Sequence, residues 1–138
     1  GQVRPGGWFA FQVPGNFGAP SHVLLREVCR LAPWRDAVGD IPRPDPVAEP
    51  ADYLRDLVAL GCAVDAWETT YLHLLQGENA VLEWVKGSAL RPVLAALDPP
   101  RQQALLEAYG ARLRTAYPAG PEGTMLPFRR LFVVARRP

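Results

Sequence analysis

The stretch RPGGWFAFQVPGNFGAP, residues 4–20, indicates the fold class of this chain. Its first four residues have the composition of a turn, because proline and glycine suit the backbone angles that turns require. Residues 8–13 form a short apolar run rich in aromatic side chains, which predicts a β-strand. Residues 14–18 predict an irregular loop, and Ser21 can begin a helix. We therefore expect this stretch to be the middle of an α/β unit, although no strand or helix is predicted before it.

Helix-like and strand-like patterns alternate along the remaining chain. Helices are predicted at 20–32, 53–60, 80–86, 88–98 and 99–117, strands at 62–75 and 128–135, and a proline-rich loop at 35–50. Because helices separate the strands, the predicted class is α/β. The helix at 99–117 carries an apolar stripe of Leu105, Tyr109, Leu113 and Ala116, which we expect to be buried.

Composition excludes several classes of function. A net charge of +1 argues against nucleic acid as a partner. The chain shows no apolar run of about 18 residues and no leader pattern, so we expect no membrane partner. Cys29 and Cys62 are far apart and belong to no Cys/His cluster, which predicts free buried thiols, no metal site and a cytoplasmic location.

The first predicted strand is apolar on both faces. This pattern is typical of a central parallel strand with neighbours on both sides. The strands that follow it supply too few neighbours, and the chain begins with Gly1 rather than Met. We therefore expect a piece of a larger domain, and we expect its uncovered sheet edge to permit self-association.

Five stretches carry a resemblance to a known family. VRPGGWFAFQ (3–12) resembles the turn and fifth strand of class I S-adenosylmethionine-dependent methyltransferases. The others resemble the trans-aconitate 2-methyltransferases within that class: QVPGNFGAPSHVLLRE, VDAWETTYLHLL, VLEWVKGSALRPVLAAL and PFRRLFVVAR. Together the stretches cover almost the whole chain in continuous register.

The resemblance implies a Rossmann-like sheet of seven strands, mostly parallel, with an antiparallel last strand. This chain, residues 1–138, is then a single partial domain that supplies strands five, six and seven. Residues 78–117 become a helical insert that lids the acceptor site. The cofactor implied is S-adenosylmethionine. Its site is expected mostly outside this chain, because the chain has no GxGxG-type loop after a first strand and no acidic residue that ends a second strand to hold the ribose hydroxyls.

The implied reaction is methylation of a carboxylate of a small polycarboxylic acid, from trans-aconitate to its monomethyl ester. A carboxylate is already anionic at neutral pH, so we expect no catalytic base, and catalysis rests on positioning and desolvation. The other carboxylates of the acid need cationic and hydrogen-bonding partners. Such partners are expected near the carboxyl ends of the strands.

Four candidate substrate-binding residues lie at that location or at a helix start. Gln12 and Asn16 follow the first strand, although such a loop can also satisfy only its own backbone. His22 begins the next helix, where an ordinary surface histidine is the alternative. Arg91 begins a helix of the insert and is our first choice for a carboxylate clamp, with a surface ion pair to Glu83 as the alternative.

Tyr71 and His73 are further substrate-binding candidates. They share one face of the strand at 62–75 with Trp67 and Thr69, by the two-residue period of a strand. Packing with satisfied hydrogen bonds is the competing interpretation of this face.

Two alternatives to the implied reaction stay open. One is methylation of another small acid or of a malonyl thioester. The other is a non-catalytic chain that lacks the cofactor site.

Overall fold

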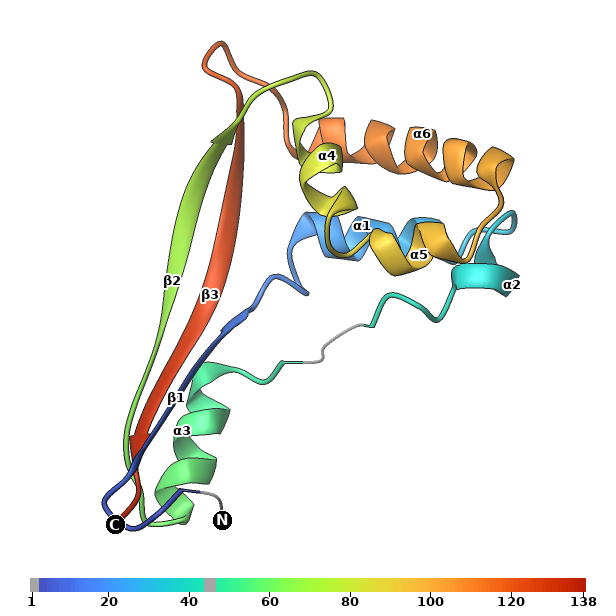
Figure 1. Ribbon diagram of the computed structural model, residues 1–138. Coiled ribbons are helices and arrows are strands. Elements are labelled where there is room, and N and C mark those ends of the chain that lie inside the picture. Colours follow the sequence, from blue (N-terminus) through green and yellow to red (C-terminus); the bar gives the residue numbers. More distant parts are fainter. Residues whose placement is uncertain (1–2, 44–46) are drawn as a thin grey trace. The chain divides into compact units, whose positions relative to one another are not determined.

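The computed structural model describes residues 3–43 and 47–138 (Figure 1). Its elements in chain order are β1 (Trp8–Pro14), α1 (Pro20–Cys29), α2 (Arg35–Val38), α3 (Pro50–Ala59), β2 (Ala63–Leu75), α4 (Ala80–Lys86), α5 (Arg91–Ala95), α6 (Pro99–Ala116) and β3 (Thr124–Arg136). Helices separate the strands, which confirms the predicted α/β class.

The predicted loop at 35–50 is wrong at its start, because Arg35–Val38 forms α2. Val38 is 1% exposed and belongs to a hydrophobic core, so packing holds this single turn in place. Residues 44–46 of the predicted loop lie outside the described residues. The predicted helix at 88–98 is reduced to α5, and β3 is longer than the predicted 128–135.

The chain divides into two compact units, each described by itself. Unit 1 comprises the described residues among 3–16, 47–71 and 127–138. Unit 2 comprises those among 17–43 and 72–126. Unit 1 therefore holds β1, α3 and most of β2 and β3, whereas unit 2 holds the other helices.

A three-stranded sheet in the order β1-β3-β2 forms the frame of unit 1. β3 runs antiparallel to β1, from the pair Trp8 with Arg136 to the pair Pro14 with Arg130. The last strand is thus antiparallel, as expected. Among the described strands β3 is central, and β1 has a neighbour on one side only.

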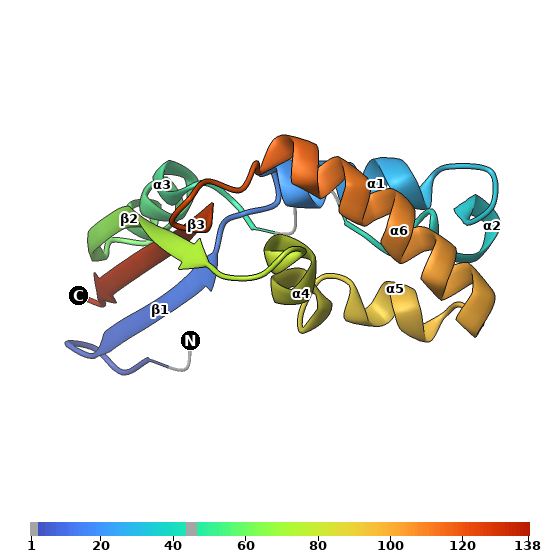
Figure 2. The same ribbon diagram turned by 90° about the horizontal axis from the view of Figure 1, so that it is seen from above.

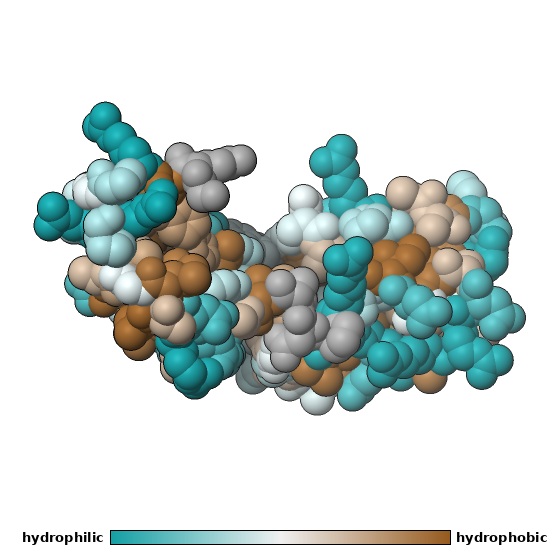
Figure 3. Space-filling model, turned by 90° about the horizontal axis from the view of Figure 1, so that it is seen from below, coloured by the Kyte–Doolittle hydropathy of each residue, from teal (hydrophilic) through white to brown (hydrophobic). Residues whose placement is uncertain are grey.

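The two faces of this sheet differ in what covers them. On one face the ring of Phe11 meets Tyr53 of α3, edge to face, with ring centroids 5.1 Å apart. On the other face Trp67 stacks on Phe132 at 5.2 Å, and Trp8 is 68% exposed. Apolar surface is accordingly visible among the polar side chains of the molecule (Figure 3).

Arg129 of β3 connects α3 to the sheet. Its guanidinium donates to Glu49, the residue before α3, at 3.1 Å from Nη1 to Oε1 and 2.5 Å from Nη2 to Oε2. Its Nε donates to Oε2 of Glu68 in β2 at 2.9 Å. These bonds raise the pKa of Arg129 and lower that of Glu49. The start of α3 is thereby held beside the sheet.

Unit 2 is built on α6, which packs against α1 and α4 (Figure 2). Its N-cap is Asp98, whose carboxylate accepts from the Arg101 N–H at 3.0 Å. Leu105, Tyr109 and Leu113 are buried, as predicted. Ala116 is exposed, contrary to prediction, because the next residue, Tyr117, takes the place against the core.

Two tyrosines, Tyr109 of α6 and Tyr117 directly after it, hold the start of α1. The Tyr109 hydroxyl is fully buried and donates to the Ser21 carbonyl at 2.7 Å. The Ser21 N–H, one of the donors that a helix start leaves unpaired, donates to the Tyr117 hydroxyl at 3.1 Å. Since no side chain at Ala19 caps α1, α6 supplies the cap.

We predict that Tyr109→Phe lowers the free energy of unfolding by about 1 kcal/mol, the net value of a typical buried hydrogen bond. The ring stays in place, so the packing is unchanged. Urea denaturation followed by tryptophan fluorescence measures the difference. Tyr53→Phe is the control, because its hydroxyl only accepts an exposed bond from the Ala48 N–H. Equal losses in both variants would contradict the role of the buried bond.

We also predict that the Glu49–Arg129 pair makes stability depend on pH. The folded-state pKa of Glu49 lies below its usual 4.5. Its contribution is therefore complete above about pH 5.5 and is lost as the pH falls through the folded-state pKa.

Urea denaturation of the native chain and of Glu49→Gln tests this prediction. The native chain should be more stable by at most about 1 kcal/mol at pH 7, because the pair is largely exposed. This difference should decrease steadily as the pH falls from about 5.5 toward 2. Glu27→Gln, which removes an exposed carboxylate on α1, should show no such difference. A difference for Glu49→Gln that does not change with pH would contradict the assignment.

Candidate functional site

The first two predicted residues, Gln12 and Asn16, lie at the end of β1 and just beyond it. Gln12 is exposed on the face that carries Phe132, and its Oε1 accepts a hydrogen bond from the Arg130 guanidinium. This contact leaves a cationic side chain beside Gln12. Together the two side chains offer hydrogen-bond donors of the kind that a carboxylate accepts.

Asn16 lies four residues further on and is only 7% exposed. Its Oδ1 accepts from the Arg129 N–H at 2.7 Å, and its Nδ2 donates to the Arg129 carbonyl at 3.1 Å. Both polar groups of its amide are thus engaged with backbone. Its predicted contact with substrate stays a prediction.

His22 lies in the first turn of α1, within unit 2. Its ring meets Phe17 at 5.4 Å, and its Nδ1 lies 3.3 Å from the Ser21 Oγ. Burial, and secondarily the charge of Arg26, lower the pKa of His22 from 6.5. The ring is therefore neutral at pH 7, so it can exchange hydrogen bonds with an anion but brings no positive charge.

Arg91 is the first residue of α5 and is exposed. The predicted alternative, an ion pair with Glu83, does not form, because Glu83 accepts from Lys86 at 2.6 Å. None of the ion pairs found among the described residues includes Arg91. Its guanidinium is accordingly available to an anion from solution.

Tyr71 and His73 lie on β2. Tyr71 is 43% exposed, and the ring of half-buried His73 lies 4.8 Å from that of Trp84 in α4. The contact with Trp84 supports the packing interpretation for His73. The exposure of Tyr71 leaves that ring accessible to a ligand.

The six predicted residues do not fall into one unit. Gln12, Asn16 and Tyr71 belong to unit 1, and His22, His73 and Arg91 belong to unit 2. Gln12 and Asn16 share the end of β1, whereas the residues of unit 2 are supplied by different elements: α1, β2 and α5.

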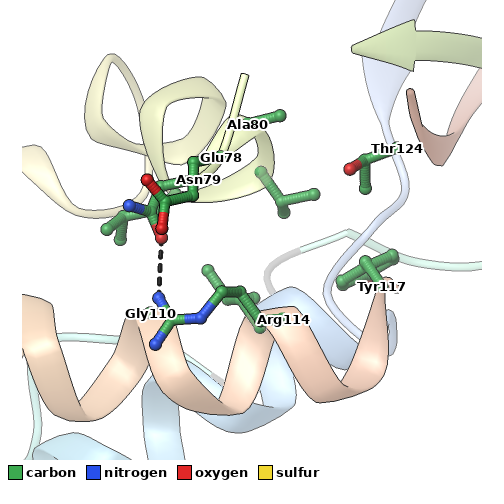
Figure 4. A pocket seen from close by; sticks show the side chains of 10 residues that line it. Glu78, Asn79, Ala80, Gly110, Arg114, Tyr117 and Thr124 are labelled. Carbon is green, nitrogen blue, oxygen red and sulfur yellow. Dashed lines mark hydrogen bonds between the residues drawn. The ribbon is translucent and has the colours of Figure 1, made fainter. Parts of the chain in front are cut away.

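A hollow within unit 2 was not predicted from the sequence (Figure 4). It lies between α4 and α6, and its lining includes Glu78, Asn79, Arg114, Tyr117 and Thr124. Arg114 Nη1 donates to Asn79 Oδ1 at 2.7 Å across the hollow. The sequence feature that could have indicated this hollow is Gly110, a glycine inside a predicted helix. In the structure Gly110 lines the hollow, and an added Cβ there would lie 3.2 Å from Leu82 Cδ2.

The described glycines do not form a cradle for a nucleotide-like cofactor. Gly6 precedes β1, Gly61 follows α3, and Gly123 precedes β3, all with positive φ. Gly77 also has positive φ and lies between a strand and a helix, but α4 has only seven residues. A cradle needs several backbone N–H groups at the start of a helix. Gly15 and Gly18 do lie between β1 and α1, but the Gly15 N–H donates to the Arg129 carbonyl and the Ser21 N–H at the start of α1 donates to the Tyr117 hydroxyl. The described part of the chain therefore does not fit S-adenosylmethionine as a complete site.

The two cysteines are free. Burial raises the pKa of Cys29 to about 11, so its thiol is protonated and unreactive at neutral pH. Cys62 is half-buried, which corrects the prediction of two buried thiols. In the part of the chain that the structure describes, no group of three metal-ligating side chains forms, and no helix has the length and apolar character needed to cross a membrane.

Comparison with known proteins gives consistent results. The chain is 57% identical over 136 residues to a protein of Streptomyces avermitilis named trans-aconitate 2-methyltransferase. The aligned region covers 98% of the chain and 51% of that protein. A protein of the same name from Streptomyces coelicolor is 53% identical, over 99% of the chain and 46% of its own length.

A third such protein, from Rhodococcus jostii, is 49% identical over 98% of the chain and 54% of its own length. No protein-family model matches the chain. The chain is thus similar over nearly its whole length to proteins named trans-aconitate 2-methyltransferase, and it spans about half of their length, in their C-terminal portion.

Proposed function

We propose that this chain is the C-terminal part of a methyltransferase that uses S-adenosylmethionine and methylates a carboxylate of a small polycarboxylic acid. The acid that we propose is trans-aconitate, and the product is its monomethyl ester. The observation that carries this proposal is the 57% identity over 98% of the chain to a protein of that name. Identity at this level over nearly the whole chain favours a common reaction.

The sheet supports the placement of this chain in the family's fold. We assign β1, β2 and β3 to strands five, six and seven of a Rossmann-like sheet. Support comes from the antiparallel pairing of β3, the last strand, with β1. It also comes from the exposure of apolar residues on β1, where Trp8 is 68% and Phe9 44% exposed. A strand inside a larger sheet would have both sides covered.

The proposed methyl transfer needs no general acid or base from the protein. The acceptor carboxylate is the nucleophile and is ionised at neutral pH, so the protein needs only to orient it and to hold the other carboxylates. Cationic donors do this best, because hydrogen bonds between charged groups are roughly twice as strong as neutral ones. The described chain therefore contributes binding and orientation, and no catalytic residue is assigned to it.

Arg91 is the primary carboxylate clamp in this proposal, since it is exposed and enters no ion pair with the other described residues. Gln12, with Arg130 beside it, is a second contact. His22, which is neutral at pH 7, is proposed as a hydrogen-bonding group of the acceptor site, together with Tyr71 and His73. Residues 78–117, which hold α4, α5 and α6, are proposed as the helical cover of that site.

S-adenosylmethionine would supply the methyl group when bound. We propose that most of its site lies outside this chain, because the described glycines do not form the required cradle. A cytoplasmic location is part of the same proposal and is supported by the two free cysteines. The open side of β1 supports self-association when this chain is isolated.

We predict that Arg91→Ala lowers kcat/KM for trans-aconitate about 10- to 100-fold in the full-length protein, mainly by raising KM. The loss of one charge-assisted hydrogen bond, about 1.5–3 kcal/mol, sets this range. Chromatographic detection of the ester measures the rates, and Arg91→Lys should retain intermediate activity.

Arg30→Ala is the matched control, because Arg30 is also exposed and lies at the end of α1 rather than at the proposed site. It should leave both constants unchanged. Native kinetics in Arg91→Ala would remove Arg91 from the site. Turnover of another small acid or of a malonyl thioester, with none of trans-aconitate, would replace the proposed substrate.

We further predict that the isolated 138-residue chain gives no heat of binding with S-adenosylmethionine in titration calorimetry at micromolar concentration. The full-length protein should bind under the same conditions. Micromolar binding by the isolated chain would show that the cofactor site has been assigned to the wrong part of the protein. Absence of binding by the full-length protein would favour a non-catalytic chain.

A further inference from the structure

The hydrogen bonds between β1 and β3 change from backbone to side-chain acceptors where β1 ends. Regular pairing runs to Pro14 opposite Arg130, and the next N–H, that of Gly15, still donates to the Arg129 carbonyl at 3.0 Å. In a regular antiparallel pair the Gly15 carbonyl would accept the Arg129 N–H in return. Here the Asn16 side chain takes over that role, with its Oδ1 at 2.7 Å from the Arg129 nitrogen.

The Asn16 amide therefore behaves as one more peptide group of β1. It accepts from the Arg129 N–H and donates to the Arg129 carbonyl, which is the exchange that two paired strand residues make. Since a backbone N–H can only donate, the oxygen of the amide must face it, and the orientation of the side chain is unambiguous. We call this pair of bonds the Asn16 clasp.

The residue types around the Asn16 clasp are restricted by space and by charge. At Gly15 an added Cβ would lie 2.2 Å from Cδ1 of Leu131, which is itself 1% exposed. At Asn16 a carboxylate would place a second oxygen against the Arg129 carbonyl, where the amide now donates. Glycine followed by an amide thus suits this site, and the chain can approach β3 closely.

The side chain of Arg129, whose backbone forms the clasp, makes further contacts of its own. The guanidinium of that residue binds Glu49, before α3, and Glu68, on β2. One residue therefore holds the end of β1 through its backbone and two other segments through its side chain. The segment Pro14–Asn16 is held by the protein itself and needs no ligand to order it.

We propose that Asn16 is a positioning residue of the acceptor site, which acts through Arg129 in place of the direct substrate contact that the sequence predicts. This inference rests on the proposed function, in which the segment after β1 borders the acceptor. Regular pairing with β3 holds Gln12 and Pro14, and the clasp extends this hold to Gly15 and Asn16, so a bound carboxylate meets a preformed surface. Preformed contacts bind more tightly because less ordering accompanies binding.

Amide hydrogen exchange in the 138-residue chain, followed by NMR, tests the clasp without any need for activity. Asn16→Ala should accelerate exchange of the Arg129 N–H at least tenfold relative to the native chain. Asn79→Ala, which removes the other asparagine and belongs to unit 2, should not accelerate it. An unchanged Arg129 exchange rate in Asn16→Ala would overturn the proposal.

Asn16→Asp adds a conservative rescue. Near pH 7 the introduced carboxylate cannot donate, and exchange should be fast. Near pH 3 the protonated carboxyl has one donor and one acceptor, as the amide has, so exchange should return to within about threefold of the native chain at the same pH. A persistent defect at low pH would contradict the exchange of two bonds.

Kinetics of the full-length protein, measured well below its unfolding temperature, test the positioning role. Asn16→Ala should raise KM for the acid about tenfold and leave KM for S-adenosylmethionine within twofold of native. The control Asp56→Ala, at an exposed position of α3, should change neither. Accelerated exchange with native KM and kcat would reduce the clasp to a structural role and overturn the proposal.

Failure of the proposed function has a separate signature. In that case the native full-length protein forms no ester from any acid tested, and the acceptor role of Asn16 is lost with it, whatever exchange shows. An active native protein combined with native kinetics in Asn16→Ala would instead reject this inference alone.

Discussion

Unit 1 depends on the surroundings of a single residue, Arg129. Its backbone pairs with Gly15 and with the Asn16 amide, and its guanidinium binds Glu49 and Glu68. These contacts reach the end of β1, the start of α3 and the middle of β2. Two carboxylates and one guanidinium leave a net negative charge at this point, and all three side chains keep some contact with water. The arrangement therefore works more as a geometric constraint than as a source of stability.

Unit 2 uses tyrosine hydroxyl groups for the same purpose. Tyr109 and Tyr117 hold the carbonyl and the N–H of Ser21, so α6 determines where α1 begins. His22 is the next residue, and its position follows from these two bonds. The helices that supply this support belong partly to the segment that we propose as a cover of the acceptor site. Its rigidity is therefore part of how it would shape that site.

Much of the fold could be predicted from patterns in the sequence. The aromatic run at Trp8–Val13, the limits of α4, the cap at Asp98 and the stripe of Leu105, Tyr109 and Leu113 all follow from periodicity and capping, which act over a few residues. The errors lie where distant residues decide. α2 exists because Val38 is buried, and Ala116 is exposed because Tyr117 packs in its place.

In the candidate site, too, some features follow from nearby residues and others depend on distant ones. The amino-acid sequence specifies which residue types follow β1 and begin the helices, and its resemblance to a family indicates what they could bind. How those side chains are used depends on contacts that form only in the folded chain. The tertiary structure leaves Arg91 exposed, makes His22 neutral and ties the Asn16 amide to a residue 113 positions away. A hydrogen bond between such distant residues depends on the register of β1 against β3, and no local pattern in the sequence specifies that register.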